Sequence, residues 1–127
     1  MVFMTLEIKV TAEQRINVLG SFRQLAGPLE VQPGCLACRV LADARNEGLI
    51  GLVVVWDGQE NLERHIRSDL FRKVLALMEA SSARREIRFH TVSRTAGLES
   101  VEQIRGAGRR IGPTAGPAAG DPAPRNQ

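Results

Sequence analysis

Trp56 and His65 are the two residues of this chain whose types and spacing best suit catalysis. An imidazole can accept a proton near neutral pH, and an indole combines one N–H donor with a large apolar surface. Trp56 ends an apolar run that begins at Leu49, and His65 follows at the edge of the apolar stripe of a predicted helix. The alternative for both residues is a structural role, because histidines on helix faces usually pack and a core tryptophan needs no function.

Cys35, Cys38 and His90 are weaker candidates. The C-x-x-C spacing suits a redox pair or half of a zinc site, but no second pair or clustered histidine completes a zinc set. Residues three apart on a strand point to opposite faces, so we expect the two sulfurs not to converge and interpret both cysteines as small apolar residues. His90 alternates with Arg88 and Val92 on a predicted strand, and the pattern leaves its face open.

The sequence contains no glycine-rich phosphate loop, nucleophile elbow or set of paired carboxylates. We therefore expect no nucleotide or flavin cofactor, no covalently attached c-type haem and no metal cofactor. The net charge is +3, and the residues up to Arg105 hold 14 of the 17 basic and 13 of the 14 acidic side chains. A nearly neutral body without tyrosine argues against a nucleic-acid partner.

Cysteine content and hydropathy predict the compartment. Two cysteines are too few for a disulfide scaffold, which favours a reducing environment. Glu7 and Lys9 interrupt the first apolar residues, unlike a signal peptide, and no apolar stretch approaches the roughly 20 residues that span a bilayer. We expect a soluble cytoplasmic protein without a membrane partner.

Hydrophobic periodicity predicts an α+β, ferredoxin-like β-α-β-β-α-β domain with a four-stranded antiparallel sheet over residues 1–105. Its strands are expected at 2–10, 35–43, 49–56 and 86–94. One helix is expected to begin at the capping box of Thr11 and Gln14 and to end at Gly27-Pro28. The second is expected to begin after Asp57, break near Ser68 and continue to about residue 80, with a short helix at 98–105. The Gly-, Ala- and Pro-rich residues 106–127 are expected to be disordered.

The third predicted strand carries apolar residues on both of its sides, which is unusual for an antiparallel sheet. Ile50, Leu52, Val54 and Trp56 share one side, and we assign them to the sheet face that the helices leave open. An apolar face of that size is rarely left in water. Dimerisation through it would enclose a cavity, with Leu52 and Val54 among the residues that line it.

The segment from Val2 to Arg105 resembles the antibiotic biosynthesis monooxygenase family of dimeric α/β barrels. The resemblance rests on Pro33-Gly34-Cys35-Leu36, Trp56 with Leu62 and His65, Ser68-Asp69-Leu70-Phe71, and Glu86-Ile87. It implies a homodimer that oxidises a quinol or polyketide-like phenol with O2 and without a cofactor. His65 would be the base or orienting group, Trp56 would line the pocket, Phe71 would close it, and His90 is a further candidate for substrate binding.

The chain also departs from the family pattern. Many members carry Glu at the position of Val54 and an aromatic residue at that of Cys38. The alternative function is a non-catalytic module that binds a small aromatic molecule or haem. Haem-degrading relatives use a Trp and a His, which Trp56 and His65 match, and an Asn on the first strand, which this chain lacks.

Overall fold

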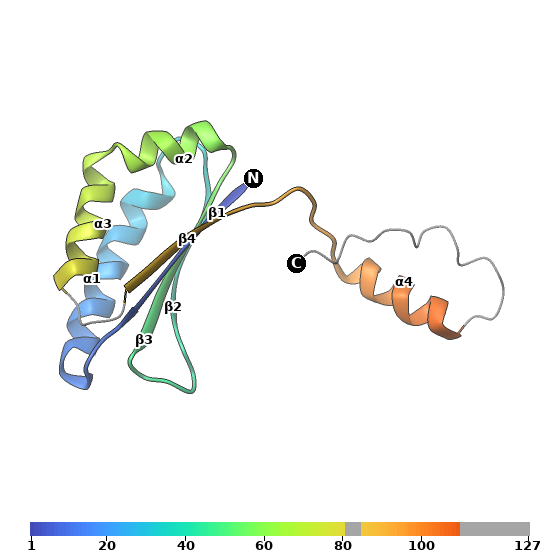
Figure 1. The fold of residues 1–127 in the computed structure, drawn as a ribbon, viewed down its shortest axis with the longest axis horizontal. Coiled ribbons are helices and arrows are strands. Elements are labelled where there is room, and N and C mark those ends of the chain that lie inside the picture. The colour runs from blue at the N-terminus through green and yellow to red at the C-terminus, as the bar shows by residue number, and fades with distance from the viewer. Residues whose placement is uncertain (81–84, 110–127) are drawn as a thin grey trace. The chain divides into compact units, whose positions relative to one another are not determined.

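A computed structural model describes residues 1–80 and 85–109, which form two compact units, Met1–Val92 and Ser93–Gln127 (Figure 1). The first unit contains, in chain order, β1 (Val2–Lys9), α1 (Ala12–Glu30), β2 (Cys35–Ala42), β3 (Leu49–Trp56), α2 (Gln59–Ile66), α3 (Asp69–Ala80) and β4 (Arg85–Thr91). The second unit contains α4 (Leu98–Arg109), which ends four residues beyond its predicted end. The rest of the segment predicted to be disordered, 110–127, lies outside the described residues.

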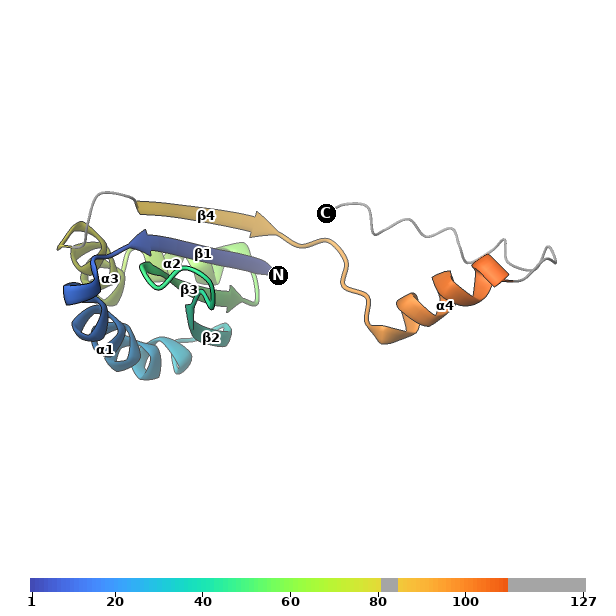
Figure 2. The ribbon, with the colours of Figure 1, turned by 90° about the horizontal axis from the view of Figure 1, so that it is seen from below.

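The four strands form one antiparallel sheet in the order β2-β3-β1-β4. The helices of the first unit lie along one face of this sheet, and none of them lies along the other face (Figure 2). This arrangement confirms the predicted α+β, ferredoxin-like fold. None of the described helices is long and apolar enough to cross a membrane.

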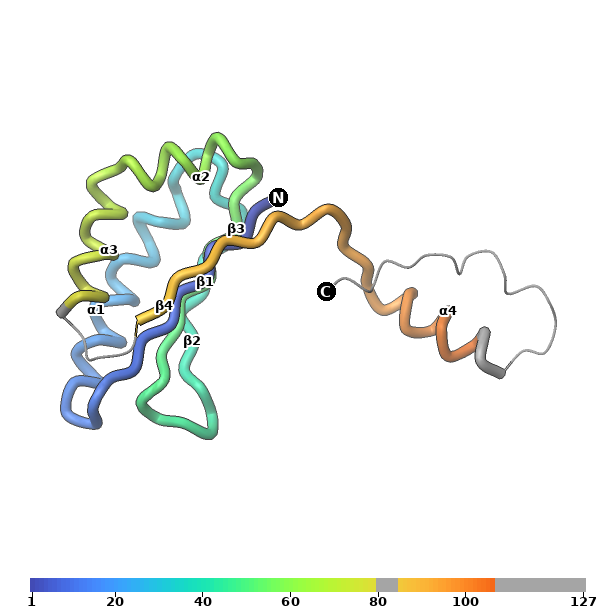
Figure 3. Tube along the Cα trace, in the orientation of Figure 1, coloured from blue at the N-terminus to red at the C-terminus, as the bar shows by residue number. Residues whose placement is uncertain are grey.

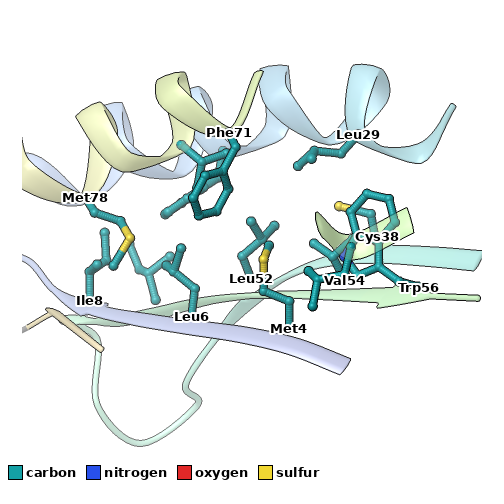
Figure 4. Close-up of a cluster of buried hydrophobic side chains, with 14 of the residues drawn as sticks. Met4, Leu6, Ile8, Leu29, Cys38, Leu52, Val54, Trp56, Phe71 and Met78 are labelled. Atoms are coloured by element: carbon teal, nitrogen blue, oxygen red, sulfur yellow. The ribbon is translucent and has the colours of Figure 1, made fainter. Parts of the chain in front are cut away.

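The core lies between the sheet and the helices (Figure 4). Alternate residues of β1 are buried there and pair with alternate residues of β3: Val2 with Trp56, Met4 with Val54, Leu6 with Leu52 and Ile8 with Ile50. The prediction that this side of β3 forms the open face is therefore wrong. Both sides of β3 are apolar, so its own pattern does not distinguish them; the register with β1 does, because only one side of β1 is apolar throughout.

The open face of the sheet carries the other set of residues. Val55 and Val53 on β3 lie beside Phe3 and Thr5 on β1, and His90 on β4 pairs with Phe3. The centre of this face is thus still apolar, although its residues differ from those predicted. Phe3 and Val53 are half-buried there and Val55 is buried, so the apolar surface left on this face is smaller than predicted.

Helix α1 begins as predicted and ends later than predicted. The Thr11 hydroxyl accepts a hydrogen bond from the Gln14 backbone N–H, and the Gln14 side chain accepts one from the Thr11 N–H, which confirms the capping box. The helix runs past Pro28 to Glu30. Pro28 removes one backbone donor, but the last turn buries Leu29 completely in the core, which offsets the loss.

The turn before β2 meets the start of α2. Gly34 has φ +83°, the only positive φ among the described residues, and glycine adopts this conformation without a steric penalty. The Asp57 N–H donates to the Gly34 carbonyl at 2.7 Å. Helix α2 begins after Gly58 without a side-chain cap, so Asp57 does not cap it as predicted. Asn61 of α2 packs directly over Gly34 and fixes the helix against this turn.

Candidate functional site

Trp56, His65 and Phe71 form one aromatic cluster between the sheet and the helices. The imidazole of His65 stacks on the indole of Trp56, with ring centroids 4.7 Å apart and planes inclined by 26°. The ring of Phe71 meets the same imidazole edge-on at 5.2 Å. Trp56 is fully buried, and His65 and Phe71 are 2% and 7% exposed. The three residues that the sequence predicted for one site are therefore brought together.

The cluster contains three nitrogen atoms without a hydrogen-bond partner in the described part of the chain. They are Nε1 of Trp56 and both ring nitrogens of His65. Burial lowers the pKa of His65 to about 4, so the imidazole is neutral at pH 7 and offers one donor and one acceptor. A buried polar group without a partner costs about 1–3 kcal/mol. Three such atoms on two stacked rings are unusual, because buried polar groups are normally hydrogen-bonded.

A bend between α2 and α3 positions both partners of Trp56, and Figure 3 follows the chain through it. The Ser68 hydroxyl donates to the backbone carbonyl of His65 at 2.6 Å and accepts from the backbone N–H of Phe71 at 3.1 Å. Ser68 therefore ends one helix and caps the next, as an N-cap serine does. One hydroxyl group thus connects the two residues that enclose the indole.

Replacing Ser68 with Ala should lower the free energy of unfolding by about 1 kcal/mol, because the cap of α3 is lost. Ser68→Thr keeps the hydroxyl and should lose less. Ser93→Ala, at an exposed position outside the first unit, is the matched control and should change nothing measurable. Urea unfolding followed by circular dichroism measures all three variants. An equal stability for the Ser68→Ala variant and the original chain would show that the hydroxyl does not hold the bend.

The remaining predicted site residues are divided between the two faces of the sheet. Leu52 and Val54 are fully buried on the same face as Trp56, beneath the helices (Figure 4). His90 is exposed on the open face, opposite Phe3, and so lies apart from the cluster. Val54, at the position where many relatives carry Glu, adds no polar group beside Trp56.

The two cysteines lie on the same face of the sheet, contrary to the prediction from their spacing. A β-bulge between Cys35 and Ala37 adds one residue to β2, so Cys35 pairs with Trp56 and Cys38 with Val54. Cys38 is buried in the core and Cys35 packs against it. The described residues contain no group of three or more His, Cys, Asp or Glu side chains that could hold a metal ion.

The sequence analysis missed the roles of two residues in this site. Ser68 was recognised as a helix start, and its spacing of three from both His65 and Phe71 was the signal that it links them. Gly34 was recognised as a turn residue, but no sequence signal shows that Asn61 packs over it.

Comparison with known proteins connects this geometry to a family. The family model described as antibiotic biosynthesis monooxygenase matches residues 1–77. The chain belongs to this family. Its members' fold is the one seen here, an α+β sandwich typical of dimeric α/β barrels. The sequence matches no curated protein.

Solved structures of family-like proteins share the fold at low sequence identity. A candidate antibiotic biosynthesis monooxygenase from Deinococcus radiodurans superposes with a TM-score of 0.70 at 17% identity, over 77% of this chain and 98% of that one. Rv0793 from Mycobacterium tuberculosis superposes with a TM-score of 0.67 at 13% identity, over 76% of this chain and 98% of that one. A variant of SnoaB from Streptomyces nogalater, a cofactor-independent oxygenase, superposes with a TM-score of 0.64 at 19% identity, over 74% of this chain and 94% of that one. At these identities the likeness shows the fold and not the substrate.

Proposed function

We propose that this chain is a cofactor-independent monooxygenase that oxidises a small, electron-rich aromatic molecule, a quinol or polyketide-like phenol, with O2. The observation that carries the proposal is the stack of Trp56 and His65, with three buried nitrogen atoms that have no partner in the described chain. Membership of the family and the fold shared with a cofactor-independent oxygenase support it.

The reaction needs few protein groups. A phenol whose ring C–H becomes a carbonyl reacts with one O2 to give a quinone and one water, so the substrate supplies all four electrons. His65 is unprotonated at pH 7 because burial lowers its pKa to about 4, and only this form accepts the phenolic proton. Deprotonation makes the ring electron-rich enough to reduce O2, and the apolar surroundings exclude water from the reactive oxygen species.

Trp56 would serve as donor and wall. Its fully buried indole N–H can hydrogen-bond an oxygen atom of the substrate, and its ring already holds His65 in one orientation. Phe71 contacts the same imidazole edge-on. Because the cluster is packed, entry of a substrate requires the bend at Arg67-Ser68 to move away from the sheet.

A homodimer is part of the same proposal. Phe3 and Val53 are half-buried on a sheet face that no helix of the first unit covers. A second copy placed face to face would bury these residues, and the fold is typical of dimeric barrels. The cluster lies on the other face of the sheet, so each protomer carries a complete cluster of its own.

Oxygen uptake by metal-free protein tests the function against a panel of hydroquinones and anthrones. With a substrate that reacts, the variants His65→Gln and Trp56→Phe should each lower the rate about a hundredfold, which is the lower end of what one acid–base group contributes. Lys73→Gln, at an exposed position of α3, is the control and should keep the rate. Uptake no faster than in buffer across the panel, or equal in all variants, would reject the proposal.

The runner-up is a non-catalytic module that binds a small aromatic molecule. The pKa of about 4 favours it, since so weak a base takes a proton from a phenol only at a cost in free energy. Haem is the less favoured ligand, because a molecule of that size would displace much of the packed core around His65. Saturable binding of an aromatic molecule by calorimetry, without oxygen uptake, would support this second function.

A further inference from the structure

The proposed oxidation uses neither cysteine, yet the bulge in β2 brings both thiols to one face of the sheet. Cys35 and Cys38 pair with Trp56 and Val54, which are alternate residues of β3 on the helix-covered side. Without the bulge, residues three apart would point to opposite faces. The bulge therefore turns a C-x-x-C sequence on a strand into two side-by-side thiols.

The spacing of these thiols suits a bridging ion better than a disulfide bond. Two steps of roughly 3.3 Å along β3 separate their pairing partners, so the two Cβ atoms lie roughly 7 Å apart. A disulfide needs Cβ atoms about 3.5–4.5 Å apart. Two thiolates that hold one metal ion at about 2.3 Å each have sulfur atoms up to about 4.6 Å apart. Side chains leaning toward each other reach that separation without moving the backbone.

The surroundings also fit a single cation. Cys35 is half-buried on β2, an edge strand of the sheet, which gives solvent a route to the pair, whereas Cys38 is buried. The sulfur of Cys35 lies 3.5 Å from the carbonyl oxygen of Ala37, so the Cys35 side chain folds back along β2 toward Cys38. The carboxylate of Glu30 contributes to raising the pKa of both thiols. Its negative charge thus acts on both sulfurs and would favour a bound cation.

We propose that Cys35 and Cys38 bind one soft monovalent cation, Cu(I), as a two-coordinate dithiolate site. Soft thiolates select Cu(I), whereas a structural zinc site needs four ligands, and the described residues offer no cluster of even three. The step is an exchange without oxidation: one Cu(I) and two thiols give the dithiolate complex and two protons released to water. Trp56 pairs with Cys35, so its indole lies beside the site.

Proton release makes the affinity depend steeply on pH. Burial is the main cause that raises the pKa of both thiols, that of Cys38 to about 11, so both are protonated at pH 7. Binding must displace both protons. The association constant should therefore rise about a hundredfold for each unit of pH between 6 and 8.

Anaerobic titration of the full chain with Cu(I), in competition with the chelator bicinchoninate, tests the site. We expect one ion per chain and quenching of the fluorescence of Trp56, which is the only tryptophan. Cys35→Ser should weaken binding at least a hundredfold, and Ala37→Ser, between the two thiols, should not. Cys38→Ser should act like Cys35→Ser, but the half-buried Cys35 carries the test because its replacement disturbs the core less.

Three results would overturn the proposal. The Cys35→Ser variant could bind Cu(I) as tightly as the original chain. A stoichiometry of one ion per two chains would place the site between chains. A mass loss of about 2 Da in the free protein after mild peroxide treatment, with no competition for Cu(I), would show that the thiols form a disulfide instead. None of these measurements depends on oxygenase activity, so the proposed Cu(I) site can be rejected without affecting the proposed monooxygenase function, and the reverse also holds.

Discussion

Between pH 7 and pH 4, His65 alone should lower the free energy of unfolding by about 3 kcal/mol. The pKa of His65 is about 4 in the folded chain and 6.5 in the unfolded chain. Between these values the unfolded state binds a proton that the folded state refuses, so stability falls as the pH falls. The contribution is complete above pH 6.5, is lost progressively down to pH 4, and changes no further below. A difference of about 2.5 pKa units corresponds to about 3 kcal/mol.

Urea unfolding at pH values from 4 to 7.5 measures this effect in the original chain and in two variants. His65→Gln keeps a polar side chain but removes the titrating group. Between pH 7 and pH 4 its free energy of unfolding should therefore fall by about 3 kcal/mol less than that of the original chain. His90→Gln is the matched control, because His90 is exposed on the open face of the sheet. Because this variant keeps the buried imidazole, it should keep the part of the pH dependence that His65 contributes. Parallel curves for the original chain and the His65→Gln variant would show that the buried imidazole titrates normally.

Replacing Gly34 with Ala should lower the free energy of unfolding by about 3 kcal/mol. The position has φ +83°, and holding a residue with a side chain in such a conformation costs on the order of 1–3 kcal/mol. A Cβ atom there would also overlap the side chain of Asn61, and such overpacking costs about 1–3 kcal/mol. Because Asn61 and His65 are both on α2, the substitution should also displace the imidazole from the indole.

The two causes can be separated by a double variant. Asn61→Gly combined with Gly34→Ala removes the overlap, including that with the Asn61 Cβ, but not the strained φ. Measured against Asn61→Gly alone, the substitution at Gly34 should then cost about half as much stability. Gly20→Ala is the control: a Cβ atom at this helical position meets nothing within 4 Å. That variant should be as stable as the original chain or up to about 1 kcal/mol more stable. If Gly34→Ala resembled Gly20→Ala, the turn would not set the position of α2.

The element order and the capping box could be predicted from the sequence, because each rests on local periodicity and spacing. The joint site of Trp56 and His65 was implied by the resemblance to the family, and their rings are stacked in the structure. The face to which Trp56 points could not, since β3 is apolar on both sides and only its register with β1 decides. Cys35 and Cys38 share a face only because of a β-bulge, and no residue of β2 gives a sequence signal for that bulge. One extra residue in a strand changes which face of the sheet the residues on one side of the bulge point to, relative to those on the other side.

The position of His65 within the core illustrates the same limit. Its spacing placed it at the edge of an apolar stripe, where a histidine can be exposed or buried. The bend at Ser68 lets α2 and α3 turn two aromatic side chains toward one indole, and this depends on hydrogen bonds to backbone atoms. Its lowered pKa follows from burial and not from any neighbouring charge. Such properties belong to the assembled structure.

The central place of β1 has a consequence for how the chain is made. β1 pairs with β3 on one side and with β4 on the other, and β4 is the last of the strands that the structure describes. About 80 residues must therefore leave the ribosome after β1 before its second partner exists, which takes roughly 4–16 s at 5–20 residues per second. During that time its alternating apolar side chains have no complete sheet in which to be buried. The nascent chain should thus need a holding chaperone on its first strand until β4 emerges.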